Sequence, residues 1–487
     1  MRGVGVLVVV LLVCIAPVLS VADSAAGDRG SAGAPPDPNS DVLGWENGYW
    51  HDERIAVDQS DGLTDAELRA YVGRAMARVE FIRRQEFDRN VTVESLPRER
   101  YSRIIRDQLR AQYTPAQRAW ENQIWEAMFA SDEPTDAARE RTRLLQERIA
   151  GFYVPGKDEI FVISGDELVV DNETLVHELT HALQDQQGGL NPSQSGARTM
   201  DGLRGRQGLT EGEASYVEKR YAQRCGAEWE CVETPGPQPK RTPYGGGPLP
   251  SYNLAMQVAT IQPYSDGPAY VASTVESGGW NAVEQQYRNP PKSSEQVIDP
   301  ETKNAPPASL RLGEQARNGW RLYGEKGENG SETVGEAGIY AMFWYQGRVY
   351  DNSVIRWQEF EDPEAGEFDV FNYTSEPSDG WANDRLWPYH KGDERGYIWR
   401  TKWDTSEDAT EFARAYRDLL HGQNATRVAP GTWVIDGGGF ADAFRIVRDG
   451  RTVTIVNGPT VADLRDIRPD SGDDTRQSSS LRARKFD

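Results

Sequence analysis

The segment at residues 171–185 constrains the fold most, because it combines a His-Glu-x-x-His motif with the pattern of an amphipathic helix. The apolar positions at helical spacing are Leu175, Val176, Leu179, Ala182 and Leu183. Asp171 or Asn172 can cap the amides at its start. His177 and His181 stand four residues apart, so a helix presents both imidazoles on one face, at the separation that a tetrahedral zinc ion requires. The alternative is an ordinary core helix that matches the motif by chance.

Glu178 is the candidate catalytic residue of this motif. On a helix it lies beside the metal, where its carboxylate can accept a proton from bound water. We therefore predict a zinc site with His177 and His181 as ligands and Glu178 as the base. The metzincin class is excluded, because it requires Gly and His where this chain has Gln184 and Gln187.

A second segment is the candidate source of the third ligand. Residues 209–216 (LTEGEASY) resemble the Asn-Glu-Gly-x-Ala-Ser-Tyr helix of the gluzincin peptidases. The resemblance implies that Glu211 is the third zinc ligand and that Glu213 has no metal role. Two residues rotate a helical side chain by roughly 200°, so Glu211 and Glu213 cannot both face one ion from a regular helix.

Other carboxylates near the motif have several possible roles. Glu213, or Asp185 one turn after His181, is a candidate to orient a ligand imidazole. Asp201 is a weaker ligand candidate, for a site of the aspzincin kind. The alternative for all three is a solvated acidic face, since the chain has 76 Asp and Glu residues.

The N-terminus carries a predicted export signal. Residues 1–22 begin with a single Arg, continue through an apolar run from Val4 to Leu19 and end in small residues at Ser20 and Ala22. This pattern favours a cleaved signal peptide and a secreted or cell-surface protein, with an uncleaved anchor as the alternative. No later segment is apolar enough to cross a bilayer, so we expect no transmembrane segment in the mature chain.

Cys225 and Cys231 are the only cysteines after the signal segment. In an exported protein, a close and even pair predicts one disulfide that closes a small loop. The alternative, a thiol metal site, lacks the second pair of cysteines that would complete it.

Charge excludes one class of partner. The formal net charge is −22, from 76 acidic and 54 basic residues, and such an excess repels nucleic acid. Only nine of the basic residues are Lys. An acidic excess with Arg in place of Lys suits a protein in concentrated salt, where the Debye length falls to roughly 3 Å. The alternative is an acidic protein from a GC-rich genome.

The composition changes along the chain and predicts the following organisation. After the signal peptide, residues 23–61 are rich in Gly, Pro, Ser, Ala and Asp and are expected to form a disordered linker. Amphipathic helices follow over 62–150, and a zinc domain over 151–346. Residues 347–468 alternate strand and helix patterns, which predicts a small α+β unit, and 469–487 form a polar tail that we expect to be disordered.

Two features refine this organisation. Residues 151–164 contain two apolar runs around a Pro-Gly pair, which predicts a hairpin immediately before the zinc helix. In zincins a sheet edge beside that helix binds the substrate backbone, although the hairpin can also simply cover the helix. The C-terminal tryptophans, which include Trp381, Trp387, Trp399 and Trp403, are more typical of a core than of a carbohydrate platform.

Together, the export signal, the acidic composition, the motif helix and the segment PPKSSEQ at residues 290–296 resemble a haloarchaeal family of exported surface proteins. This segment resembles Pro-Pro-x-Ser-Thr-Glu-Gln-x-x-His-Pro-Glu, with Asp299 at the position of the His, and we assign Asp299 no role. The resemblance implies an α+β fold with a mainly helical, gluzincin-like zinc domain and a small edge sheet.

Two functions follow from these observations. In the first, His177, His181 and Glu211 hold Zn²⁺ and the protein hydrolyses a polypeptide substrate with Glu178 as the base. The candidates to stabilise the oxyanion are Tyr270, Tyr287 and Arg288. In the second, the protein is a non-enzymatic cell-surface module whose zinc is structural, which would require Asp185 or Asp201 as a fourth ligand.

Overall fold

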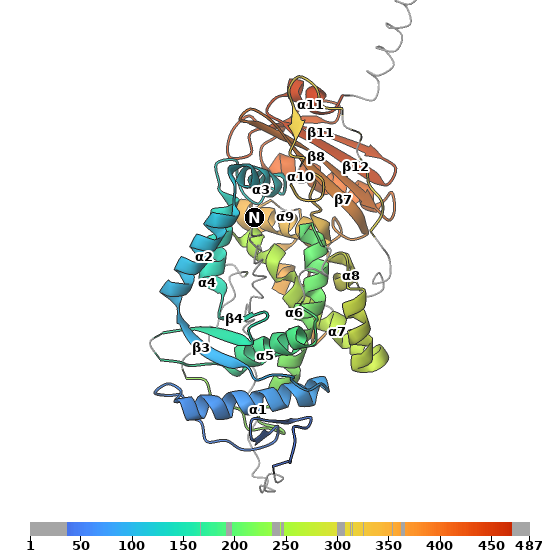
Figure 1. The fold of residues 1–487 in the computed structure, drawn as a ribbon. Helices are drawn as coiled ribbons and strands as arrows, with labels where there is room; N and C mark the ends of the chain where they lie inside the picture. The colour runs from blue at the N-terminus through green and yellow to red at the C-terminus, as the bar shows by residue number, and fades with distance from the viewer. Residues whose placement is uncertain are drawn as a thin grey trace, which may run out of the picture.

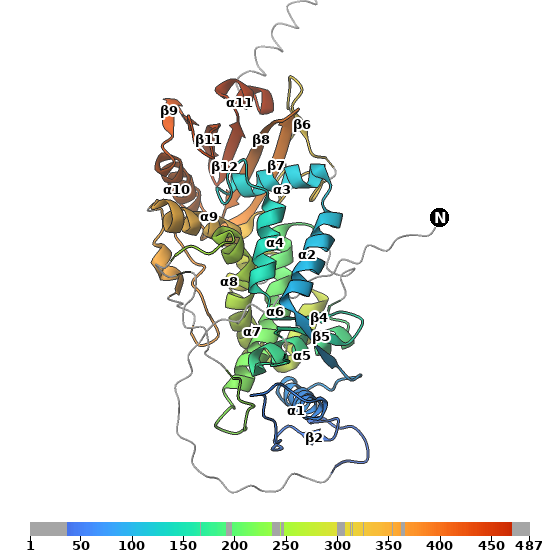
Figure 2. The same cartoon turned by 90° about the vertical axis from the view of Figure 1, so that its left-hand side faces the viewer.

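The computed structural model describes residues 37–469, apart from 166, 191–196, 236–243, 245–247, 300–306, 312, 314, 325, 353 and 362–365. Over these residues the protein is a mixed α+β structure, as the sequence predicts. A seven-stranded sheet lies at one end, the motif helix lies toward the other end, and helices connect the two (Figures 1 and 2). The predicted signal peptide and all but the first residue of the predicted tail lie outside the described residues.

The N-terminal segment corrects one prediction. Residues 23–36 of the expected disordered linker lie outside the described residues, but 37–61 are structured: β1 (Trp45–Glu46) pairs with β2 (Tyr49–Trp50) in an antiparallel hairpin. The side-chain amide of Gln59 is buried and bonds to Val170 and Glu233. The Gly- and Pro-rich composition that suggested disorder instead reflects tight turns. The residues that hold this segment in place, Val170 and Glu233, are distant in the sequence, so local composition does not indicate them.

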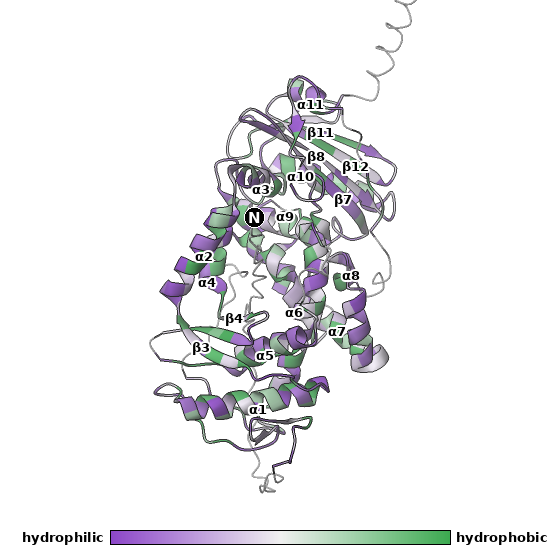
Figure 3. Cartoon of the chain, viewed as in Figure 1, coloured by the Kyte–Doolittle hydropathy of each residue, from purple (hydrophilic) through white to green (hydrophobic). Residues whose placement is uncertain are grey.

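The helices predicted over residues 62–150 are present as α1 (Asp65–Arg83), α2 (Arg98–Gln112), α3 (Pro115–Ala127) and α4 (Ala137–Arg148). Thr64 and Thr114 start α1 and α3 with capping boxes, and Asp136 caps α4. Figure 3 shows hydrophilic and hydrophobic residues interspersed along α1 and α2. Helix α2 buries one side, with Tyr101 and Ile105, whereas α1 is buried on most sides from Ala70 onward.

A three-stranded sheet lies beside the motif helix. The predicted hairpin forms β4 (Gly151–Val154) and β5 (Glu159–Ser164), and the unpredicted strand β3 (Thr92–Pro97) pairs parallel to β5. The strand order is β3-β5-β4, so β4 is an edge strand. Strand β3 could not be predicted from its local sequence, because its partner strand lies more than sixty residues later in the chain.

The predicted motif helix is α5 (Asn172–Gln186), and Asp171 caps it through the backbone amide of Thr174 at 2.7 Å. The predicted Glu211 helix is α6 (Met200–Ala222). It packs along α7 (Leu254–Arg288), which bends at Gly278 and Gly279. The short helix α8 (Glu295–Ile298) follows.

The remaining elements form the C-terminal part of the fold. They are β6 (Arg321–Leu322), α9 (Gly335–Tyr350), η2 (Trp357–Glu361), β7 (Trp381–Lys391), β8 (Glu394–Trp403), α10 (Asp408–Gly422), β9 (Thr426–Ala429), β10 (Thr432–Val434), β11 (Ala443–Asp449), β12 (Thr452–Gly458) and α11 (Val461–Ile467). The sheet order is β6-β7-β8-β12-β11-β10-β9, with antiparallel pairs throughout. Strands β11 and β12 form an antiparallel hairpin.

One hydrophobic core contains residues from all three of the regions predicted over 62–150, 151–346 and 347–468. It contains residues of α2, α3, α4, α7 and α9 together with the inner face of the seven-stranded sheet. The predicted boundary between 346 and 347 falls inside α9. Trp381, Trp399 and Trp403 are fully buried and Trp387 is nearly so, which supports a core role for these residues.

Two further predictions concerned a disulfide and membrane-spanning segments. Cys225 and Cys231 form a disulfide, with their sulfur atoms 2.04 Å apart. Among the described helices, none combines the length and the apolar composition that crossing a membrane demands.

Candidate metal centre

The three predicted ligands converge at one point between α5 and α6. His177, His181 and Glu211 each offer a ligand atom, and these atoms lie within 4.8 Å of one another. The Nε2 atoms of His177 and His181 are 3.3 and 3.2 Å from Oε2 of Glu211. Because all three side chains are buried, they meet inside the protein rather than on a solvated face. The arrangement can hold a metal ion.

Glu178 occupies the position that the motif predicts for a base. Its side chain is fully buried, and neither carboxylate oxygen makes a hydrogen bond of normal geometry, although the backbone N–H of Tyr153 approaches it. Burial raises the pKa of Glu178 to about 7, and the neighbouring His181 and His177 partly oppose this shift. A carboxylate without bonded partners is available to accept a proton.

Glu211 is held in its charged form. Burial alone would raise the pKa of its carboxyl, but the charge of His181 and hydrogen bonds to both imidazoles outweigh burial and lower the pKa to about 2. The outer oxygen, Oε1, has no hydrogen-bond partner among the described residues. An anionic carboxylate next to two imidazole nitrogens is a donor set that zinc prefers.

Two residues that the sequence analysis missed orient the imidazoles. Oε2 of Glu218 lies 3.1 Å from Nδ1 of His177, and Oε1 of Gln184 lies 2.9 Å from Nδ1 of His181. Gln184 in turn donates to the carbonyl of Thr210. Each acceptor favours the tautomer in which Nδ1 carries the proton, so that Nε2 is the nitrogen that can bind a metal. Helical spacing is the signal, since Glu218 follows Glu211 by two turns.

The carboxylates proposed as alternatives lie elsewhere. Glu213 binds Arg83 and Tyr287, and Asp201 accepts hydrogen bonds from the amide and hydroxyl of Ser294. Glu213 therefore does not orient a ligand imidazole, and Asp201 is not a ligand. Both residues instead bind α6 to its neighbours.

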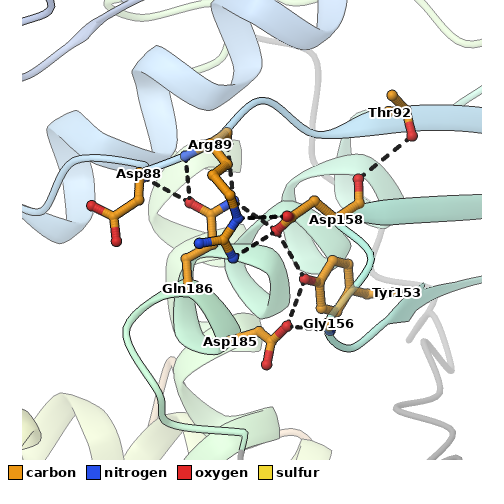
Figure 4. Close-up of polar contacts among 8 residues, drawn as sticks. All are labelled: Asp88, Arg89, Thr92, Tyr153, Gly156, Asp158, Asp185 and Gln186. Atoms are coloured by element: carbon orange, nitrogen blue, oxygen red, sulfur yellow. Dashed lines mark hydrogen bonds and ion pairs between the residues drawn. The ribbon is translucent and has the colours of Figure 1, made fainter.

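Asp185 also serves another purpose (Figure 4). Its Oδ2 atom accepts hydrogen bonds from the hydroxyl of Tyr153, at 2.8 Å, and from the amide of Gly156, at 2.6 Å. The next residue, Gln186, donates to Asp158 and accepts from the amides of Asp88 and Arg89. These contacts fasten the β4–β5 hairpin to the end of α5. The candidate metal site therefore has three possible protein ligands among the described residues.

The residues suggested for oxyanion binding contact other residues and not the three candidate metal ligands. The hydroxyl of Tyr270 donates to Gln286, that of Tyr287 donates to Glu213, and Arg288 is exposed. The aromatic residue at the centre is instead Tyr264 of α7, whose ring stacks on His177 with the centroids 5.9 Å apart. The sequence pattern of α7 did not distinguish Tyr264 from its other buried residues.

Close packing around α6 sets the position of Glu211. A Cβ atom at Gly212 would lie 2.4 Å from the carbonyl oxygen of Gly267, and one at Gly205 would lie 2.6 Å from the amide of Ser293. Ser293 belongs to the PPKSSEQ segment, so this segment packs against α6. Glycine at these positions lets α7 and the segment approach the backbone of α6.

Comparisons with known proteins cover the other end of the chain. Residues 320–468 match a family described as a domain of unknown function (DUF8575). The match spans β6 to α11 and excludes α5 and α6. No curated protein and no solved structure matches the chain.

Proposed function

We propose that this protein is an exported, zinc-dependent metallopeptidase with a zincin-like site of the gluzincin kind. One observation carries the proposal: three buried ligand atoms, from His177, His181 and Glu211, converge beside Glu178, a buried carboxylate without a bonded partner. The predicted signal peptide supports export, and the resemblance to exported surface proteins supports a location outside the cell.

The donor set fits zinc. With zinc–ligand bonds of about 2.0–2.1 Å, two ligands of a tetrahedral site stand about 3.4 Å apart. The two separations between imidazole nitrogen and Glu211 oxygen are 3.3 and 3.2 Å. Glu218 and Gln184 contact the Nδ1 atoms, so both imidazoles direct Nε2 toward Glu211. Three protein ligands leave one coordination position open, which is typical of catalytic rather than structural zinc sites.

The chemistry divides between the ion and Glu178. When bound, zinc supplies a Lewis acid that brings the pKa of water toward neutrality and polarises a carbonyl group. Glu178 accepts a proton from the attacking water at its carboxylate and returns that proton to the amine of the leaving peptide. Glu211 stays anionic, and Glu218 and Gln184 keep both imidazoles in one orientation.

The edge of β4 can position a peptide for this reaction. Ile163 donates to the carbonyl of Ala150 at 2.7 Å, so alternation of the antiparallel ladder turns the backbone groups of Gly151 and Tyr153 away from β5. Among the described strands none pairs with this edge. Because the amide of Tyr153 approaches Glu178, a peptide added along β4 would pass the proposed base.

The variant Glu178→Gln tests the proposal. It removes the base but keeps the shape of the side chain, so we expect an unchanged zinc content and a loss of peptide cleavage of about 10²–10⁴-fold. Glu99→Gln, at an exposed carboxylate of α2 away from the candidate site, is the control and should cleave like the wild type. Cleavage of a casein substrate should be measured at low and high salt. Equal cleavage by both variants would remove Glu178 from the mechanism, and zinc binding without any cleavage by the wild type would favour a non-enzymatic surface protein.

A further inference from the structure

A groove lined by arginine lies between α2, α3 and α4, away from the metal centre. It has a volume of about 680 Å³. Its arginines are Arg106 and Arg110 of α2, Arg118 of α3, and Arg139 and Arg143 of α4. The lining contains no lysine and a single carboxylate, that of Asp136. In a chain with a net charge of −22, such a concentration of positive charge is opposite in sign to the rest of the molecule.

Nearby carboxylates neutralise only part of this charge. Asp136 lies 2.6 Å from Arg118, and Glu140 lies 2.8 Å from Arg143. The side chains of Arg106, Arg110 and Arg139 form neither an ion pair nor a hydrogen bond within the part of the chain that the structure describes, and all three are exposed. The groove therefore has three guanidinium groups that are free to bind a ligand.

These free groups come from two helices that pack against each other. Arg106 and Arg110 are one turn apart on α2, and Arg139 lies on α4, which contacts α2. Like charges that line one groove repel, and the folded protein bears this cost unless an anion lies between them. A bound oxyanion would convert the repulsion into charge-assisted hydrogen bonds.

The shape and surroundings of the groove define the class of anion. Arginine forks match the planar or tetrahedral oxygens of carboxylates and phosphates better than they match a single halide ion. The volume falls within the range of small-molecule pockets, which is roughly 300–1,000 Å³. A long polyanion such as nucleic acid or an acidic polysaccharide would extend beyond the groove and meet the negative charge of the remaining surface.

We propose that this groove binds a small, multiply charged oxyanion that carries two or more phosphate or carboxylate groups. Arg106, Arg110 and Arg139 bind these groups. The half-buried ring of Tyr113 and the side chain of Leu109 form an apolar part of the wall that can contact the body of the ligand. This site is independent of the proposed peptidase chemistry.

Calorimetric titration of the full chain with pyrophosphate and with citrate tests this proposal. Both titrations should be made at the same chloride concentration and ionic strength. We expect saturable binding of one molecule per chain, weakened at least about 100-fold in the Arg106→Gln, Arg139→Gln double variant, since each charge-assisted hydrogen bond accounts for roughly tenfold or more. The pyrophosphate and citrate arms distinguish phosphate ligands from carboxylate ligands.

The matched control is the Arg69→Gln, Arg100→Gln double variant. Both arginines are exposed, lack side-chain partners among the described residues and lie outside the groove, so this variant loses the same charge and should bind like the wild type. Both double variants keep the metal centre, so any binding of the probes there is common to all samples. The thermal midpoint of each variant verifies that it is folded. Equal affinities of the two double variants, or no saturable binding of either probe by the wild type, would overturn the proposal.

Discussion

The contact between Gly212 and Gly267 allows a sharp test of how the fold positions the third ligand. A methyl group at Gly212 would lie 2.4, 2.5 and 2.7 Å from the carbonyl oxygen, carbonyl carbon and Cα of Gly267. Ordinary van der Waals contact begins near 3.4 Å. Gly212→Ala therefore requires α6 and α7 to separate by about 1 Å, because the opposing atoms are backbone and no side chain can rotate away.

Two opposing effects determine the change in stability. Alanine in a helix interior is favoured over glycine by roughly 0.5–1 kcal/mol. Overpacking of a closely packed interface costs typically 1–3 kcal/mol, so the free energy of unfolding should fall by about 1–2 kcal/mol. Glu211 is the preceding residue, and metal sites tolerate deviations of only about 0.2 Å in ligand distance. Zinc affinity should consequently fall at least about tenfold.

Chemical denaturation in the presence of a chelator measures the first effect, and zinc titration against a competing chelator measures the second. Gly437→Ala is the control, because that position has no atom within 4 Å of the added methyl group, and its stability and zinc affinity should match the wild type. A Gly212→Ala protein as stable as the wild type, with the same zinc affinity, would refute the argument that this helix contact fixes Glu211.

Two further predictions concern buried carboxylates. Glu218→Gln should lower zinc affinity about 10–100-fold, because it weakens the contact that orients His177, and an unchanged affinity in a chelator competition would exclude that role. Burial, with the charge of Asp442, raises the pKa of Glu126 in α3 from 4.5 to about 8. The folded state therefore binds this proton more tightly, and the resulting stability is present below about pH 4.5 and lost as the pH rises through 8. Glu126→Gln should match the wild type at pH 5 and exceed its unfolding free energy at pH 8.5 by up to a few kcal/mol; equal stability at both values would contradict the shift.

The convergence of the candidate ligands could be predicted largely because the histidine spacing is local information. Four-residue spacing on an amphipathic helix places His177 and His181 together whatever the rest of the fold does. Glu211 required the additional resemblance to a known helix, since nothing in its own neighbourhood distinguishes it from Glu213. The structure separates these two residues by their helical phase: one faces the imidazoles and the other faces Arg83.

Long-range pairing explains what the sequence did not predict. β3 becomes a strand because β5 offers it a parallel partner, and Tyr264 reaches His177 only because α7 packs along α6. Long-range packing also joins the predicted N-terminal and C-terminal regions. Helix α3 packs against β7 and β8, which come more than 200 residues later, and α4 packs against α7.

Diffraction data collected on both sides of the zinc absorption edge, from crystals of the protein with zinc, test the central claim most directly. We predict one anomalous peak about 2.0–2.2 Å from Nε2 of His177, Nε2 of His181 and a carboxylate oxygen of Glu211. A zinc position that Glu211 does not contact, or the absence of a peak between these three side chains, would contradict the account.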